Sequence, residues 1–322
     1  MRAPMLFFAL VAVVASTIFT SVRAQSFPVK AIRLVVPNSP GGGTDILARL
    51  LAARLQDLWA QPVIVDYRPG AGTVTGTEYV VKAAPDGYTL GMSLSSLVIN
   101  PSVRSNLPYD TLKDLVGVSI TAISPNVITA SASLEVRNIA ELIALAKKEP
   151  GKLSFATAGT GSGLHMAAEL LKMTAGIDMV HVPYKGSGPG YPDVIAGRVQ
   201  LMFDPLFSSL PYIKTGKLKA LAVTSATRSP SAPDIPALAE TLPGFSVVST
   251  NGVIAPAATP RELVARISAD FAAAVRMPET RARMAEIGLD PVGSTPEEYQ
   301  QFIRSEIEKW SKVVKFSGLK LD

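Results

Sequence analysis

The sequence predicts an α/β protein with two domains, and three observations support this. The chain has 322 residues, which is long for a single hydrophobic core. Short apolar runs alternate with helical patterns from Ile32 onward, as is typical of βαβ units and parallel sheets. One pattern of strand, glycine loop and helix occurs twice, with an offset of 120 residues.

The expected strands are short apolar runs rich in β-branched and aromatic residues, at 32–36, 62–67, 88–94, 152–157, 179–184, 199–204 and 218–225. Helical periodicity between them predicts helices over 44–59, 138–149 and 164–175, and a mostly helical C-terminal part. The last helix is expected to begin after Thr295, with Pro296 in the first turn and Glu298 completing a capping box.

The internal repeat aligns "LVVPNSPGGGTDILARLL" (34–51) with "SFATAGTGSGLHMAAELL" (154–171) without a gap. Gly41 then corresponds to Gly161, and Gly43 corresponds to Gly163. If each domain holds one copy, two helix N-termini can face a shared cleft. The alternative is that any two strand-to-helix turns look alike.

The first 24 residues are expected to be a secretory leader, with cleavage after Ala24 and a mature chain that starts at Gln25. Arg2 precedes an apolar stretch of 15 residues, Met5–Phe19, and Val22 and Ala24 fit a small-residue cleavage site. The stretch is shorter than the roughly 20 residues of a membrane span, so an uncleaved anchor is the weaker alternative. We therefore expect a location outside the cytoplasm, in a bacterial periplasm.

Composition excludes several classes of protein. The chain has no cysteine, so it has no disulfide, no thiolate metal site and no lipid anchor on cysteine. Without the two arginines of the leader, 29 basic and 26 acidic residues leave a net charge of +3. This charge is too small and too dispersed for a nucleic-acid surface, so no nucleic-acid partner is expected.

Two glycine-rich junctions are the main candidates for a binding site. At the start of a helix the first N–H groups have no partner within the helix, the dipole is positive, and glycine lets an anion come close. The alternative for each loop is a tight turn that needs a positive φ angle. The candidate residues are Ser39, Pro40, Gly41, Gly42, Gly43 and Asp45 in the first loop, and Thr160, Gly161, Ser162 and His165 in the second.

Nucleotide-binding motifs are absent from both loops. Gly43 is followed by Thr44 and Asp45, whereas a phosphate-binding P-loop requires Gly-Lys-Ser/Thr. The stretch "RPGAGTVTG" (68–76) approaches a dinucleotide fingerprint, but the ribose-binding acid expected roughly 20 residues later is missing. We therefore expect no cofactor.

Catalytic motifs are also absent. No G-x-S-x-G elbow occurs, because Thr160 in "TGSG" and Lys185 in "KGSG" stand where the first glycine of the motif should be. The two histidines, His165 and His181, are 16 residues apart and fit no common zinc pattern. We expect no metal site and no enzyme activity, with both histidines as structural residues or polar lining.

A third dense region is "HVPYKGSGPGYPDVIAGRVQLMFDP" (181–205). Lys185 and Gly186 belong to a strand-to-helix turn, and Asp204 ends a strand. Ligands of open α/β sheets bind outside the carboxyl ends of strands. Asp204 is therefore expected either to accept a hydrogen bond from the ligand or to cap the next helix.

Five motifs are spread over nearly the whole mature chain: "VPNSPGGGTDILARLLA", "VDYRPGAGTVTGTEYVVKAAPDGYTL", "ATAGTGSGLHMAAELLK", "VPYKGSGPGYPDVIAGRVQLMFDP" and "GKLKALAVTS". Together and in this order they resemble the Bug family, the periplasmic substrate-binding proteins of tripartite tricarboxylate transporters. The resemblance implies a two-domain venus-flytrap fold of the type II periplasmic-binding kind, with the ligand in the interdomain cleft. Domain one would comprise 25–125 and 249–322, and domain two 126–248.

The resemblance also implies the function. Ser39–Asp45 and Thr160–His165 would hold a small carboxylate, partly through waters, with Asp204 at the cleft. The partners would be integral-membrane transporter subunits, and the protein is expected to be a monomer. A sensor accessory of a signalling receptor is the alternative, and a secreted hydrolase is a weaker one. The sequence leaves open whether the acid is a dicarboxylate, a tricarboxylate, an amino acid or an aromatic acid.

Overall fold

The computed structural model describes residues 27–321, so the predicted leader lies outside the described residues. The strands are β1 (Ile32–Val36), β2 (Val63–Tyr67), β3 (Thr89–Leu94), β4 (Leu115–Ser131), β5 (Ser154–Thr157), β6 (Val180–Pro183), β7 (Leu201–Pro205), β8 (Leu218–Val223), β9 (Val248–Pro256) and β10 (Asp290–Pro291). The seven predicted strands are confirmed. Strands β4 and β9, which the sequence analysis missed, are the two longest.

The helices are α1 (Gly43–Trp59), α2 (Val74–Val81), α3 (Ser96–Val103), α4 (Thr111–Asp114), α5 (Ile139–Lys148), α6 (Gly163–Ala175), α7 (Tyr191–Ile195), α8 (Leu206–Lys214), α9 (Arg261–Arg276), α10 (Pro278–Glu286) and α11 (Pro296–Ser317). The predicted capping box of α11 is confirmed. The Thr295 hydroxyl accepts from the N–H of Glu298 at 3.2 Å, and the Glu298 carboxylate accepts from the N–H of Thr295 at 2.8 Å.

The strands form one path in the order β2-β1-β3-β9-β4-β7-β5-β6, with β8 and β10 also paired to β4. The strands of the predicted βαβ units pair in parallel, β1 with β2 and β3, and β5 with β6 and β7. All pairs that involve β4 or β9 are antiparallel. The parallel pairing predicted for the βαβ units is therefore confirmed, and the antiparallel pairs of β4 and β9 make the whole sheet mixed.

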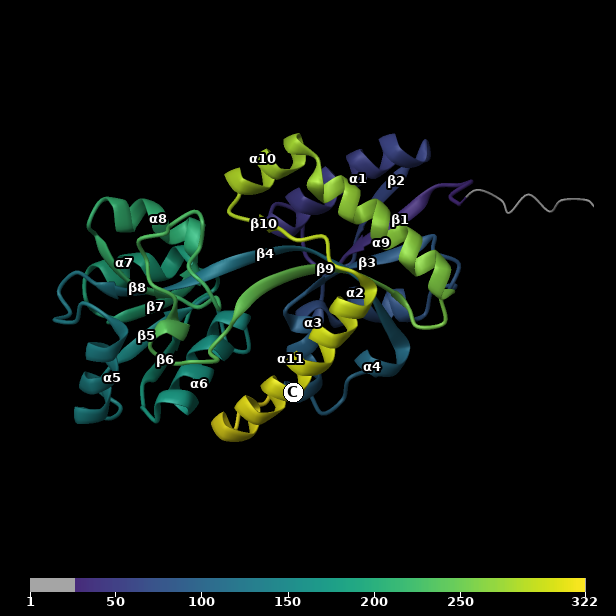
Figure 1. The fold of residues 1–322 in the computed structure, drawn as a ribbon. Helices are drawn as coiled ribbons and strands as arrows, with labels where there is room; N and C mark the ends of the chain where they lie inside the picture. The colour runs from purple at the N-terminus through teal and green to yellow at the C-terminus, as the bar shows by residue number, and fades with distance from the viewer. Residues whose placement is uncertain (1–26, 322) are drawn as a thin grey trace, which may run out of the picture.

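Strand β4 changes partners halfway along its 17 residues. Residues Leu115–Pro125 pair with β9, whereas Asn126–Ala130 pair with β7. Two lobes result. The first lobe contains β1–β3, β9, β10, α1–α4 and α9–α11, and the second lobe contains β5–β8 and α5–α8. Figure 1 shows β4 and β9 running between the two lobes.

The first lobe is packed around fully buried side chains of β1, α1 and α9. Leu34 of β1 and Leu47 of α1 belong to the same core cluster as Phe271 of α9. In α9 the buried residues recur with the three- and four-residue spacing of one helix face, at Val264, Ile267, Phe271 and Val275. This apolar stripe holds the helix on the sheet and leaves its other face in solvent.

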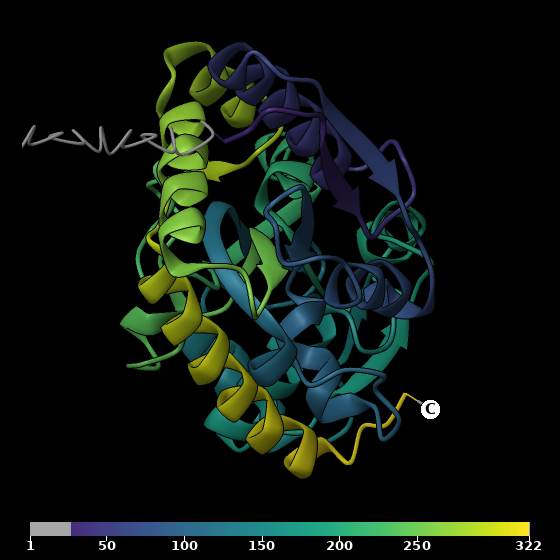
Figure 2. The same ribbon diagram turned by 90° about the vertical axis from the view of Figure 1, so that its right-hand side faces the viewer.

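The core of the second lobe is continuous with the face of α3 and α11 that points towards it. Phe155 and Phe203 are fully buried there, and Trp310 of α11 belongs to the same cluster. In Figure 2, α9 and α11 follow one another along one side of the molecule, and the chain end then returns to the opposite side. There the N–H of Leu321 donates to the carbonyl of Val103 at 2.8 Å.

Candidate functional site

The first glycine loop joins β1 to α1 and is held from below by Asp45. Gly41 has φ +101°, which turns its N–H towards the Asp45 carboxylate at 2.7 Å. Asp45 also accepts from the Tyr67 hydroxyl at 2.6 Å and pairs with Arg49. Burial raises the pKa of Asp45, but these hydrogen bonds and the charge of Arg49 outweigh it, and the pKa lies below its usual value.

The N-terminus of α1 has no side-chain cap. Gly42 occupies the cap position and offers no acceptor, so the first N–H groups of the helix remain free to meet an anion. The residues from Ser39 to Gly43 are exposed. This loop therefore presents backbone donors and the positive end of the helix dipole to whatever approaches.

The second glycine loop joins β5 to α6 and is held in a similar way by His165. Gly161 has φ +74°, and its N–H donates to Nδ1 of His165 at 3.1 Å. Ser162 caps the helix: its hydroxyl donates to the carbonyl of Gly159 at 2.7 Å and accepts from the N–H of His165 at 3.2 Å. Gly41 and Gly161, which correspond in the internal repeat, thus occupy equivalent places.

A cleft of about 360 Å³ lies between the two loops, which is a typical size for a small-molecule site. Its polar lining is made of hydroxyl, amide and backbone groups, and none of the described residues that line it is charged. The lining residues are Gly43, Thr44, Leu94, Ser95, Ser96, Ser124, Ser162, Gly163, Leu164, Pro205, Phe207, Ser249, Thr250, Asn251, Ile287 and Leu289.

A third helix N-terminus, that of α3, reaches this cleft and was missed by the sequence analysis. Ser95 and Ser96 stand where β3 runs into α3, and the Ser95 hydroxyl accepts from the N–H of Thr250 at 3.1 Å. The Ser96 hydroxyl lies 2.7 Å from that of Thr73. The sequence signal was a strand followed directly by "SS", a junction with hydroxyls but without glycine.

Asn251 of β9 was also missed, because nothing local marks it. Its Oδ1 accepts from the Thr44 hydroxyl of α1 at 2.8 Å. This bond fixes the orientation of the side-chain amide, so the two N–H groups of Asn251 point away from Thr44. The cleft therefore gains a side-chain donor from the strand that connects the lobes.

The other candidate residues lie around the cleft without lining it. Asp45 and His165 are buried behind their loops, and Thr160 is exposed at the tip of the second loop. Lys185 is exposed and Gly186 half-buried in the turn after β6. The structure thus brings Gly43 and Ser162 together directly, and Asp45 and His165 only as supports.

Asp204 is fully buried at the end of β7, and its neighbour Pro205 lines the cleft. Its Oδ2 accepts from the hydroxyls of Tyr191 and Ser209, the latter at 3.2 Å. Burial raises the pKa of Asp204 to about 6, although hydrogen bonds from Ser187, Tyr191 and Ser209 oppose the rise. It does not cap α8, because Pro205 holds that position and no side chain caps the helix.

One wall of the cleft is apolar and is formed across the two lobes. Phe207 lies in the first turn of α8 in the second lobe, and Ile287 and Leu289 precede β10 in the first. A β-carbon built on Gly288 would overlap the Phe207 side chain, so this glycine allows the lobes to touch. The cleft thus combines polar helix ends with a hydrocarbon surface.

A second hollow, of about 540 Å³, lies on the first lobe between α4, α9 and α11. Arg261 and Arg304 line it together with Glu297, above apolar residues such as Leu115. It shares no lining residue with the cleft, and neither glycine loop reaches it. It is larger than the cleft, and the starts of α9 at Arg261 and of α11 at Pro296 line it, but it lacks the glycine loops that open the N-termini of α1 and α6 to a ligand.

Within residues 27–321, no cluster of three His, Asp or Glu side chains is arranged to hold a metal ion. Over the same range, no helix has both the length and the apolar content that crossing a bilayer requires.

Comparison with known proteins identifies relatives along nearly the whole chain. The family model described as tripartite tricarboxylate transporter family receptor matches residues 47–319. Protein BugT of Bordetella pertussis is 37% identical over 303 residues, covering 93% of this chain and 93% of that protein.

Solved structures show the same fold. R. palustris Rpa4515, determined with adipate, is 36% identical with a TM-score of 0.75, covering 91% of this chain and 99% of that one. MatC (Rpa3494) from Rhodopseudomonas palustris, determined with bound malate, is 30% identical with a TM-score of 0.70, covering 89% of this chain and 100% of that one.

Proposed function

The chain belongs to the tripartite tricarboxylate transporter receptor family, a family of periplasmic solute-binding proteins, and from this premise we propose that it captures a small carboxylate in the cleft between its lobes. The acid would then be delivered to the integral-membrane subunits of a tripartite transporter. The observation that carries the proposal is the convergence of the helix N-termini of α1, α3 and α6 on one cleft.

An uncharged cleft suits reversible capture of an acid. Backbone N–H groups and hydroxyls hydrogen-bond a carboxylate strongly, because one partner is ionised, and the helix dipoles add to the attraction. A buried arginine would hold the acid more tightly and at a larger desolvation cost. The proposed donors are the N–H groups around Gly43 and Gly163, with Asn251 adding a side-chain donor.

The ligand we propose is an acid with a hydrocarbon body and one or two carboxylates. The wall formed by Phe207, Ile287 and Leu289 can cover the methylene groups or the ring of a ligand, and this contact removes apolar surface from water. A tricarboxylate would leave charges against this wall without partners. A relative determined with adipate, a dicarboxylate with an apolar chain, supports this choice.

We further propose that the two lobes move as the domains 25–125 with 249–322, and 126–248. The change of β4 partners between Pro125 and Asn126 and the start of β9 at Val248 support these boundaries. Closure would bring Gly43 and Gly163 towards the same ligand. We propose that the protein acts as a monomer.

The proposed location is the periplasm, after export and cleavage behind Ala24. Edman sequencing of the protein from a periplasmic fraction should begin at Gln25. Recovery in the membrane fraction with Met5–Phe19 still attached would contradict it.

A ligand screen tests the binding function. Binding stabilises the folded protein by RT ln(1 + [L]/Kd), about 2.7 kcal/mol at one hundred times Kd. With roughly 2–4 °C per kcal/mol, or somewhat less in a chain of this size, the melting midpoint should rise by about 5–10 °C. Adipate should give a larger rise than citrate. A screen in which only nucleotides or sugars raise the midpoint would contradict the proposal.

The same screen separates binding from catalysis. We propose that the bound acid is recovered unmodified after long incubation. Turnover that disappears in His165→Ala or Ser162→Ala would instead indicate a hydrolase. Whether the closed form docks on a transporter or on a signalling receptor is decided by co-purification of the acid-loaded protein with each candidate membrane partner.

A further inference from the structure

The two glycine loops are held by the same kind of hydrogen bond, but the accepting side chain is a carboxylate in one loop and an imidazole in the other. In each loop a glycine with positive φ donates its N–H to the side chain four residues later, Asp45 in the first and His165 in the second. The next helical turn places Arg49 on Asp45 and Glu169 near His165. The acceptor is thus a fixed anion in one loop and an imidazole in the other.

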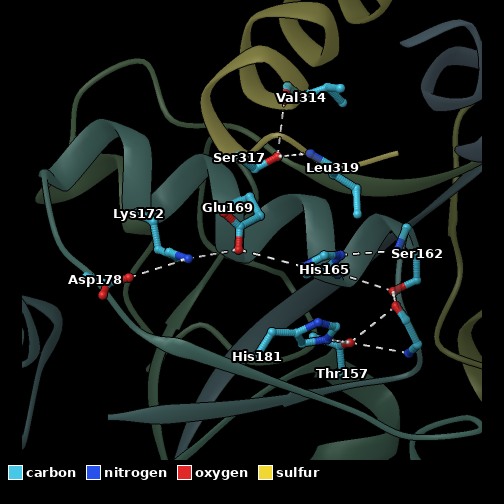
Figure 3. Close-up of polar contacts among 12 residues, drawn as sticks. Thr157, Ser162, His165, Glu169, Lys172, Asp178, His181, Val314, Ser317 and Leu319 are labelled. Atoms are coloured by element: carbon cyan, nitrogen blue, oxygen red, sulfur yellow. Dashed lines mark hydrogen bonds and ion pairs between the residues drawn. The ribbon is translucent and has the colours of Figure 1, made fainter. Parts of the chain in front are cut away.

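The hydrogen bond to Gly161 fixes the tautomer of His165. A ring nitrogen that accepts an N–H carries no proton, so the proton of neutral His165 lies on Nε2. Nε2 is 3.6 Å from the Glu169 carboxylate. Figure 3 shows the two side chains joined by a dashed line. His165 is 5% exposed, so no solvent replaces these partners.

The groups around His165 come from three elements. Within α6, Glu169 favours a charged imidazole, whereas Lys172, 3.1 Å from Glu169, opposes it. From β6, the His181 ring stacks on His165 with centroids 3.8 Å apart, and it is itself held by the Thr157 hydroxyl of β5 at 2.7 Å. Burial and the neighbouring His165 lower the pKa of His181 to about 4, so His181 stays neutral when His165 gains a proton.

A second proton on His165 must go to Nδ1, which is the atom that holds Gly161. Two N–H donors would then face each other, and the loop that carries Ser162 and Gly163 would lose its hydrogen bond from Gly161 to the imidazole, while the bonds of the Ser162 hydroxyl stay in place. Asp45 has no equivalent weakness, because its pKa lies below the usual value and it remains an acceptor. Only the second loop can therefore be released by a proton.

We propose that His165 is a positioning residue whose neutral form holds the second loop in its binding shape, so that protonation of His165 weakens the capture of the acid. The inference rests on the proposed function of the cleft. The competing effect of the same proton is purely electrostatic: a positive charge on His165 behind the α6 N-terminus would attract the anion and raise the affinity. The two differ in sign, since only loop release makes the affinity fall on acidification.

The test compares adipate affinity, measured by calorimetry, across the range where histidines ordinarily titrate, about pH 5 to 8. His165→Asn places a carbonyl oxygen near the position of Nδ1 and has no proton to gain there. Because adipate itself takes up protons, the measured quantity is the ratio of wild-type to variant affinity at each pH. This ratio should fall by about threefold to tenfold on acidification, the value of one net hydrogen bond.

Two further variants assign the effect. His165→Ala should bind adipate about tenfold more weakly than His165→Asn at every pH, because it offers no acceptor. His181→Phe keeps a ring on His165 and should keep the pH dependence of the wild type. Equal affinities of the Asn and Ala variants, a wild-type ratio that is flat with pH, or a ratio that rises on acidification would each overturn the inference.

Imidazole ¹⁵N NMR of the adipate-free protein gives a test that does not depend on binding. Neutral His165 should carry its proton on Nε2, and a proton on Nδ1 would overturn the inference. If no acid binds the wild type at any pH, the proposed function fails, while this assignment still decides the tautomer on which His165 positioning depends.

Discussion

Replacing Gly43 with alanine should make the protein more stable and a weaker binder. Gly43 is the first residue of α1 and lines the cleft. A β-carbon built there meets no atom within 4 Å and its φ is not in the left-handed region, so the protein itself has room for the methyl group. The methyl group would, however, stand beside the N–H groups that we propose for the carboxylate.

Both magnitudes can be worked from this geometry. Alanine in place of glycine at a compatible position stabilises a protein by about 0.4–1 kcal/mol, which should raise the melting midpoint by roughly 1–4 °C. Loss of one hydrogen bond to a charged group costs about 1.5–3 kcal/mol, which should weaken binding roughly 10-fold to 150-fold. Thermal melts without ligand and calorimetry with adipate measure the two effects separately.

The chain supplies matched variants for this experiment. Gly163→Ala alters the same position of α6, where the new methyl group comes 3.6 Å from Cβ of Ser95, an ordinary contact. Gly188→Ala is the control, because its β-carbon also meets open space but Gly188 does not line the cleft. Unchanged affinity in folded Gly43→Ala and Gly163→Ala would refute the reasoning and leave both loops as turns.

Gly161 is a poorer position for this test than the sequence alone indicates. Bulk at Gly42 or Gly161 is expected from the sequence to block the ligand. The structure shows that a β-carbon on Gly161 would overlap the Leu321 side chain, and φ there is +74°. A valine at Gly161 would therefore disturb the fold and the site together, whereas Gly42 and Gly43 face open space.

Three further predictions concern groups around the cleft. The pKa of Asp204 rises to about 6 on folding, so the stabilisation from its protonated form is present below about pH 4 and is lost as the pH rises through about 6. Thermal melts should therefore show that Asp204→Asn is more stable than wild type above pH 6, by up to about 3 kcal/mol. Equal stabilities above pH 6 would contradict the raised pKa. Asn251→Ala should weaken adipate binding about twofold to tenfold in calorimetry, and unchanged binding would remove Asn251 from the site. Gly288→Ala should push Phe207 away and enlarge the radius of gyration in X-ray scattering, with partial rescue by Phe207→Gly; an unchanged radius would mean that this contact does not hold the lobes.

The melts that test the pKa of Asp204 must compare wild type with Asp204→Asn at each pH, because a second buried group, His181, changes the stability with pH in the opposite direction. The pKa of His181 falls to about 4 on folding. The contribution of neutral His181 to stability is therefore present above the pKa of the unfolded chain and is lost as the pH falls towards 4. Wild-type stability alone would therefore mix two opposing trends. The difference between wild type and Asp204→Asn isolates the carboxyl group.

The strands that join the lobes escaped sequence analysis for a physical reason. Strand β4 contains Ser119, Thr121, Ser124 and Pro125, which together suggest a turn rather than a buried strand. The three hydroxyls are buried because distant carbonyls accept from them, such as that of Ser294 at 2.7 Å and that of Gly288 at 3.0 Å. Partners more than 160 residues away leave no local pattern.

The residues of the candidate site also fall into those that a local sequence pattern marks and those that only the folded sheet brings together. The glycine loops were found because strand, glycine and helix are neighbours in sequence, and the internal repeat placed Gly41 and Gly161 at matching positions. Ser95 and Asn251 were missed because only the folded sheet brings them beside the loops. The sequence also could not show that the side chains of Asp45 and His165 turn back to hold their own loops. Their assignment as ligand-binding residues stays a prediction.

A crystal structure of the protein with adipate tests the central claim most directly. The account predicts a carboxylate between the lobes, with its oxygens within hydrogen-bond distance of N–H groups at the starts of α1 and α6 and its methylene chain against Phe207 and Leu289. Adipate held instead by Arg261 and Arg304 in the hollow of the first lobe, with the cleft empty, would contradict it.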